Sequence, residues 1–178
     1  MKKYIASLFL FASLALTGCI KDINPSGMTI AIPASQITES LQKEFPFEQK
    51  TKYGKVVLKD PKALLEKGSD KITAGTTVLF SNALIPEQKA SVYISGKPYF
   101  DAASGNIYLN EPSIEKLEAN GYQLTNLLKG SIKSAVTPVI NEFFRNFPIY
   151  KVNRSSVKGS LVKNVRVEDG ALLLTLGL

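Results

Sequence analysis

The chain has 178 residues, a formal charge of +7 at pH 7, one cysteine and no histidine. This composition excludes Ser-His-Asp and Cys-His catalysis, zinc sites built on His and Cys, and an internal disulfide. No Walker or G-x-G-x-x-G motif supports a nucleotide site. We therefore predict no metal and no cofactor, and the positive charge favours anionic partners such as lipid headgroups.

A Ser-Lys pair is the nucleophilic mechanism that this composition leaves open. The S-x-x-K spacing occurs four times, at Ser40/Lys43, Ser113/Lys116, Ser155/Lys158 and Ser160/Lys163. Chance allows four such matches in a chain rich in Ser and Lys, and neither S-D-N nor K-T-G accompanies them. We assign no catalytic residue and expect that the protein is not an enzyme.

The N-terminus has the pattern of a secretory signal, which we assign to residues 1–18. Lys2 and Lys3 precede an uncharged apolar run of 13 residues, Tyr4 to Leu16. A helix of this length is too short to cross a hydrocarbon core of about 30 Å, but it fits the hydrophobic region of a signal peptide.

Leu16-Thr17-Gly18-Cys19 resembles the lipobox of bacterial lipoproteins. The resemblance implies cleavage before Cys19 and the addition of diacylglycerol and a further acyl chain such as palmitate, which together hold a protein stably on a membrane. The alternative is a core cysteine behind an ordinary signal. In such lipoproteins an Asp after the cysteine retains the protein at the inner membrane, whereas Ile20 follows it here. We therefore expect a protein anchored to the outer membrane and facing the periplasm, where nucleic acid is not a partner.

The rest of the chain divides into a tether, residues 19–27, and a single domain, residues 28–178. The tether spans at most about 27 Å when extended. Alternation from Met28 to Ile32 predicts a strand. A short helix is expected from Gln36 to Phe45, with Ser35 as its N-cap, because its apolar residues are spaced by four.

The stretch from Lys55 to Leu117 has a period of two, which is typical of strands. Its alternating segments, such as Ile72 to Phe80, are separated by short turn signals, for example Gly68-Ser69-Asp70. Strands joined by short turns pair antiparallel, so we predict a meander of about four strands. Ser113 to Asn120 fits a helical turn as well as a strand end.

A long amphipathic helix is predicted from Tyr122 to Pro148, because its apolar residues recur at three and four and form a wide stripe. Pro138 removes a backbone donor inside it, so we expect a kink there or, alternatively, a boundary between two helices. Beyond it, Asp169-Gly170 lies between the alternating segments Val162–Val167 and Leu172–Leu176, which predicts a hairpin.

Three stretches resemble the YceB-like lipoproteins of Gram-negative envelopes: "ASQITESLQKEFPF", "RNFPIY" and "LVKNVRVEDGALLLTLGL". That family has no established activity, and the resemblance transfers no functional residues. Its fold resembles the tubular lipid-binding superfamily, the BPI type, in which a curved sheet wraps a long helix. The expected fold class is therefore α+β: a long, kinked helix wrapped by a strongly curved antiparallel sheet, plus a short N-terminal helix.

This fold implies a protein that binds a lipid or another hydrophobic small molecule in a groove between the helix and the sheet. The candidate contacts lie on the helix stripe, at Val136, Val139, Ile140, Phe143, Phe144 and Phe147. Helix stripes commonly form core, so the alternative is an envelope adaptor or interaction protein with a fully packed core and partners that the sequence does not name.

A second candidate site is a stretch without acidic residues between Glu142 and Glu168, which holds six cations. We expect contacts with anionic headgroups at Arg145, Lys151, Arg154 and Lys158, because cations near an anionic membrane surface contribute about 1 kcal/mol each. Scattered, solvated side chains are the alternative.

Overall fold

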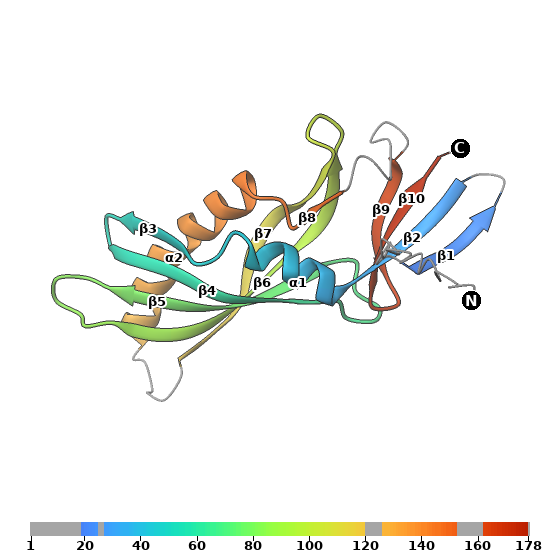
Figure 1. The fold of residues 1–178 in the computed structure, drawn as a ribbon. Coiled ribbons are helices and arrows are strands. Elements are labelled where there is room, and N and C mark those ends of the chain that lie inside the picture. Colours follow the sequence, from blue (N-terminus) through green and yellow to red (C-terminus); the bar gives the residue numbers. More distant parts are fainter. Residues whose placement is uncertain (1–18, 25–26, 120–125, 153–161, 178) are drawn as a thin grey trace, which may run out of the picture.

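The computed structural model describes residues 19–24, 27–119, 126–152 and 162–177, which form two antiparallel sheets and two helices (Figure 1). We call the smaller one the terminal sheet; it has four strands, in the order β1-β2-β10-β9. These strands are β1 (Cys19–Asn24), β2 (Gly27–Pro33), β9 (Val162–Glu168) and β10 (Ala171–Leu176). The predicted hairpin is confirmed as β9 and β10, with Asp169 and Gly170 in its turn.

The large sheet has six strands, in the order β3-β4-β5-β6-β7-β8. Its strands are β3 (Phe47–Thr51), β4 (Gly54–Leu64), β5 (Ile72–Ser81), β6 (Gln88–Asp101), β7 (Asn106–Ala119) and β8 (Tyr150–Lys151). The predicted meander of four strands is confirmed as β4 to β7. β5 shows the cause, because every second residue from Ile72 to Phe80 is buried. Residues 113–119 belong to strand β7 rather than to a helical turn.

Helix α1 (Ala34–Gln42) begins and ends earlier than the predicted helix. Pro33, not Ser35, occupies its N-cap position and makes no side-chain capping bond. Ile37 and Leu41 are buried, as their spacing of four predicts.

Helix α2 (Asn126–Asn146) runs unbroken through Pro138 for 21 residues, so the alternative of a boundary between two helices is wrong. Its two sides differ sharply in exposure. The apolar stripe is buried, while the opposite side is exposed at Lys133, Ser134, Pro138, Glu142 and Arg145. Because Pro138 lies on the exposed side, its ring does not disturb the packed stripe. The kink at this proline stays a prediction.

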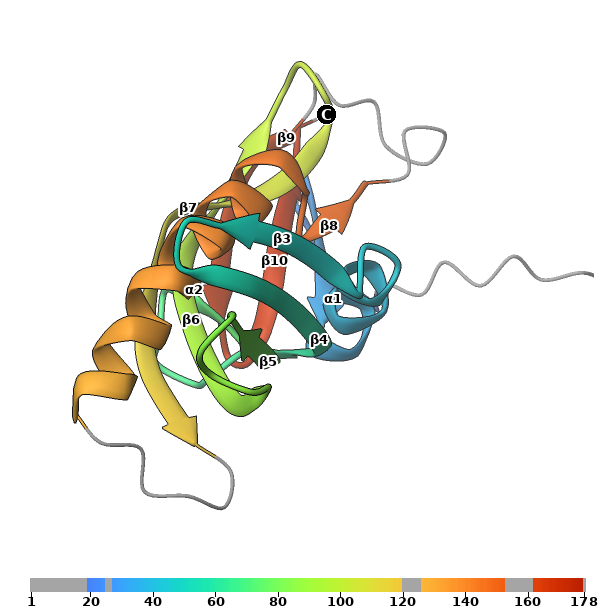
Figure 2. The same cartoon turned by 90° about the vertical axis from the view of Figure 1, so that its left-hand side faces the viewer.

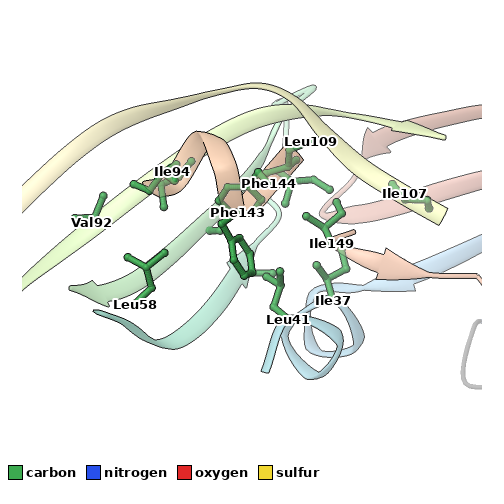
Figure 3. Close-up of a cluster of buried hydrophobic side chains, with 14 of the residues drawn as sticks. Ile37, Leu41, Leu58, Val92, Ile94, Ile107, Leu109, Phe143, Phe144 and Ile149 are labelled. Carbon is green, nitrogen blue, oxygen red and sulfur yellow. The ribbon is translucent and has the colours of Figure 1, made fainter. Parts of the chain in front are cut away.

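The core lies between the two helices and one face of the large sheet (Figure 3), and it continues into the terminal sheet at Ile32, Val167, Leu172, Leu174 and Leu176. Phe143 and Phe144 of α2 point into it, and Ile37 and Leu41 of α1 meet them from the other side. The large sheet contributes the remaining labelled strand residues, Leu58, Val92, Ile94, Ile107 and Leu109. α2 therefore folds with the sheet through a shared apolar interior.

The expected fold class, a long helix wrapped by a strongly curved sheet, is wrong. The structure is mostly β: 58% of the described residues lie in strands, and these strands divide into two separate sheets. α2 contacts β7, β4 and β3, yet its side from Lys133 to Arg145 faces solvent. The helix thus covers a sheet rather than being enclosed by one. The terminal sheet accounts for strands that the expected fold had assigned to a single sheet.

The segment predicted as a tether contains β1, which pairs with β2 and places Cys19 opposite Ala31. Lys21 Nζ lies 3.3 Å from an Asp169 carboxylate oxygen and 3.6 Å from one of Glu168. Residues 19–24 are therefore held along the edge of the terminal sheet.

Candidate functional site

The six predicted ligand contacts of α2 pack against other side chains of the protein. Val136, Val139, Ile140, Phe143 and Phe144 are buried, and Phe147 is partly buried against the core. The ring of Phe143 lies 5.0 Å from that of Phe45, 5.2 Å from that of Phe47 and 5.0 Å from that of Phe147, measured between centroids. Such ring pairs add to the stability that apolar burial provides.

Two of the four predicted headgroup contacts lie in the described part of the chain. Arg145 is exposed in the last turn of α2. Lys151 is exposed on β8, and its Nζ lies 2.6 Å from a carboxylate oxygen of Glu44, so its charge is matched within the protein. Arg154 and Lys158 lie outside the described residues. Cys19 is the first residue of β1.

A hollow of about 810 Å³ lies between α1 and β4, and we call it the α1–β4 groove. It exists because β4 is irregular there: Lys59 pairs with Thr77 and Lys62 with Gly75, so Asp60 and Pro61 together face a single residue of β5. This is a β-bulge, and Asp60 has a positive φ of 53° within it. The Thr76 hydroxyl donates to the Lys59 carbonyl at 2.7 Å, which satisfies a polar group beside the bulge.

Thr38 fixes α1 beside this bulge. Its hydroxyl donates to the Ala34 carbonyl at 2.9 Å and accepts from the Ala63 N–H at 2.9 Å, so one side chain joins the helix to the strand. The groove residues are then of two kinds. The apolar ones are Ala34, Pro61, Ala63, Leu64 and Leu65, and the polar or charged ones include Glu39, Gln42, Asp60 and Lys62. Apolar surface with a polar rim is typical of binding sites for protein segments.

This groove was not predicted from the sequence, although one signal for it was present. Pro61 falls inside a stretch read as strand, and a proline within a strand is confined to edges and bulges. The bulge itself was therefore predictable. The position of α1 beside it was not, because it depends on a tertiary contact.

The comparison with protein families decides where this chain belongs. The profile of DUF1439, described as a protein of unknown function, matches residues 32–169, which is well over half of the chain. The chain belongs to the DUF1439 family. This membership fits the resemblance to the uncharacterised YceB-like family. No curated protein matches the chain.

The matched DUF1439 region contains α1, the whole large sheet, α2 and β9, and so the α1–β4 groove as well. Within the residues that the structure describes, no helix is long and apolar enough to span a membrane. The same residues contain no group of three His, Cys, Asp or Glu side chains that could hold a metal ion.

One polar cluster of the DUF1439 domain resembles an activated serine, and its geometry argues against that role. The Ser95 and Ser113 hydroxyls lie 2.5 and 2.9 Å from the same Glu115 oxygen. These hydrogen bonds hold the pKa of Glu115 below its usual value, so the carboxylate is a weak base. Lys116, the partner of Ser113 in the S-x-x-K spacing, instead pairs with Glu118 at 2.5 Å.

Proposed function

We propose that this DUF1439 protein is a lipid-anchored envelope adaptor: it binds another protein at its surface and is not an enzyme. The observation that carries the proposal is the burial of the α2 stripe. Phe143 has 0% of its surface exposed and touches four other phenyl rings. A stripe that is already covered by the protein's own side chains needs no ligand to shield it from water.

The anchor in this proposal is Cys19, and its support comes from the sequence. The lipobox-like Leu16 to Cys19 follows a signal-like segment, and Ile20 favours the outer membrane and a periplasmic domain. Metabolic labelling with palmitate tests it. We expect the label on the wild-type chain and its loss in Cys19→Ala. Equal labelling of both chains would contradict the anchor.

The surface that we assign to a partner protein is the α1–β4 groove. Its apolar floor suits a few aliphatic side chains, and Glu39 and Asp60 at its rim suit a flanking Lys or Arg. The groove lining thus holds two acids and one cation, Lys62. The occupant that fits is therefore a short protein segment with apolar residues beside a cation.

The groove assignment is tested by photo-crosslinking in cells. A crosslinking residue at Gln42 lies in the groove, and one at Ser134, on the exposed side of α2, is the matched control. We expect a protein adduct from position 42 that is lost when Glu39→Lys and Asp60→Lys are added. Identical adducts from both positions, or adducts unaffected by the charge changes, would refute the groove.

Binding of a lipid inside the protein is the competing function. It requires α2 to move away from the large sheet, because the six candidate residues contact the core. Native mass spectrometry of residues 19–178, which contain every described element, separates the two functions. We expect the mass of the protein alone, and a copurified lipid mass would favour the internal groove.

A further inference from the structure

The end of the large sheet that points away from the terminal sheet carries an unusual surface (Figure 1). Two connections meet there: the β3–β4 turn, residues 51–54, and the β5–β6 loop, residues 82–87. Figure 2 views the molecule from this end. We call these two connections, with Lys50 and Lys55 beside them, the tip. A hollow of about 540 Å³ lies between them.

The tip holds two of the three large hydrophobic side chains that are exposed among the described residues. Leu84 is 93% exposed and Tyr53 is 41% exposed. Leu84 is held there by an ordered loop: the Asn82 side-chain oxygen accepts the N–H groups of Leu84 at 2.9 Å and Ile85 at 2.8 Å. The Asn82 N–H also donates to the Ile85 carbonyl at 3.1 Å. The loop therefore presents a leucine to solvent in a fixed position.

The two connections are also tied to each other. The Asn82 side-chain amide donates to the Tyr53 carbonyl at 3.1 Å. Within the turn, the Thr51 hydroxyl donates to the Gly54 carbonyl at 3.0 Å and accepts from the Tyr53 N–H at 3.2 Å. Gly54 has a φ of 149° and approaches the Ser81 carbonyl so closely that a Cβ would lie 2.4 Å from it. Tyr53 and Leu84 therefore share one braced platform.

The charges of the tip are unbalanced. Lys50 lies directly opposite Lys55 in the β3–β4 pair, and like charges in that position repel. Lys55 forms an ion pair with Glu48, in which Nζ lies 2.8 Å from a carboxylate oxygen. Among the described residues no carboxylate pairs with Lys50 or Lys52, and the Lys52 ammonium lies 5.1 Å from the centre of the Tyr53 ring. An anionic surface would supply the counter-charges that Lys50 and Lys52 do not find among the described carboxylates.

We propose that the tip docks on an anionic phospholipid bilayer. Leu84 enters the headgroup region, Tyr53 lies at the interface, and Lys50 and Lys52 meet lipid phosphates. An apolar apex flanked by an aromatic residue and lysines has the composition of membrane-surface contacts. Single exposed apolar residues are common on protein surfaces, so the indication is the combination at the tip: Leu84 and Tyr53 are both exposed, and lysines lie beside them in the same hollow. The proposal does not rest on the α1–β4 groove or on Cys19. The tip points away from the terminal sheet that contains Cys19 (Figure 1), so tip docking and lipidation are separate membrane contacts, and either can fail without the other.

Vesicle sedimentation tests the proposal with residues 19–178 carrying Cys19→Ser, which removes lipidation as a cause of binding. We expect binding to vesicles that contain phosphatidylglycerol, weak binding to pure phosphatidylcholine, and loss of binding at high salt. Leu84→Asp should weaken binding at least tenfold. Lys50→Glu and Lys52→Glu should each weaken it about fivefold or more.

Two matched controls lie away from the tip. Lys67→Glu changes an exposed lysine beyond the opposite end of β4, and Tyr99→Asp changes the third exposed large hydrophobic. Both should bind vesicles as the parent does. Equal binding to neutral and anionic vesicles, or equal losses in the tip and control variants, would overturn the proposal.

A fluorescence experiment avoids variants that lose binding by misfolding. The chain has no tryptophan, so Leu84→Trp introduces a single reporter at the apex of the loop. We expect a blue shift of its emission on phosphatidylglycerol vesicles and none on phosphatidylcholine alone. Bound protein with an unshifted spectrum would show that another surface makes the contact.

Discussion

Helix α2 and the tip both place apolar side chains close to cations, yet the protein treats them in opposite ways. The α2 stripe is covered by the large sheet, α1 and neighbouring phenyl rings, whereas Leu84 is left almost entirely in solvent on a braced loop. The wide apolar stripe of this helix thus marks residues that pack in the core of the protein. An exposed apolar residue beside an exposed aromatic residue and several lysines is the better indicator of a partner.

The largest expected effect tests whether the stripe is packed core. Phe143→Ala should lower the free energy of unfolding by about 3–5 kcal/mol, because it leaves a cavity among four phenyl rings. Urea denaturation measures the change. Arg145→Ala, on the exposed side of the same helix, should stay within about 0.5 kcal/mol of the parent. If Phe143→Ala cost less than about 1 kcal/mol, the stripe would line an open space instead.

The next effect tests the bracing of the tip. Gly54→Ala should destabilise the protein by about 2–3 kcal/mol, because Gly54 has a positive φ and the new Cβ would meet the Ser81 carbonyl. Gly68→Ala is the matched control, since Gly68 also has a positive φ but nothing lies near its Cβ position. It should cost about 1 kcal/mol. If thermal or urea unfolding showed equal losses of stability in Gly54→Ala and Gly68→Ala, the close contact between the β3–β4 turn and the Ser81 carbonyl would be refuted.

A smaller effect tests whether the exposed Leu84 contributes to membrane binding without contributing to the stability of the fold. Leu84→Ser should change the free energy of unfolding by less than about 0.5 kcal/mol, because the side chain has almost no contacts to lose. The same variant should bind anionic vesicles more weakly than the parent. A marked drop in melting temperature would mean that Leu84 packs in the core, and its contrast with the buried α2 stripe would be wrong.

The smallest effect concerns Glu115, a charged residue outside both regions. Hydrogen bonds from Ser95 and Ser113 lower its pKa in the folded state, so it contributes stability above the unfolded pKa of about 4.3. That contribution is lost as the pH falls through the lowered folded pKa. Glu115→Gln should therefore lose less stability than the parent between pH 6 and pH 3. Glu66→Gln is the control, and melting temperatures that fall equally in Glu115→Gln and the parent would contradict the role of these bonds.

Local periodicity predicted the elements that depend on neighbours in the sequence. The alternation in β5, the four-strand meander and the Asp169-Gly170 hairpin are all present, and α2 lies within the predicted helix. Periodicity could not predict the pairing of β2 with β10, which joins Pro33 to Ala171. That pairing creates the separate terminal sheet, and without it the fold class was assigned to a single wrapped sheet.

The candidate sites were predicted less well, for a related reason. The stripe of α2 was correctly recognised as apolar, but the sequence does not say whether a protein side chain or a ligand covers it. The sequence analysis did not single out Leu84, because a lone apolar residue in a loop carries no periodic signal. Its exposure follows from the Asn82 hydrogen bonds, which only coordinates reveal.

Hydrogen exchange with and without phosphatidylglycerol vesicles tests the contrast between these two regions most directly. We predict that amides of α2 exchange slowly and equally in both conditions, while those of the β3–β4 turn and the β5–β6 loop become protected on the vesicles. Rapid exchange of α2 that slows only when lipid is added, with no change at the tip, would contradict this account and restore the helix as the lipid-binding element.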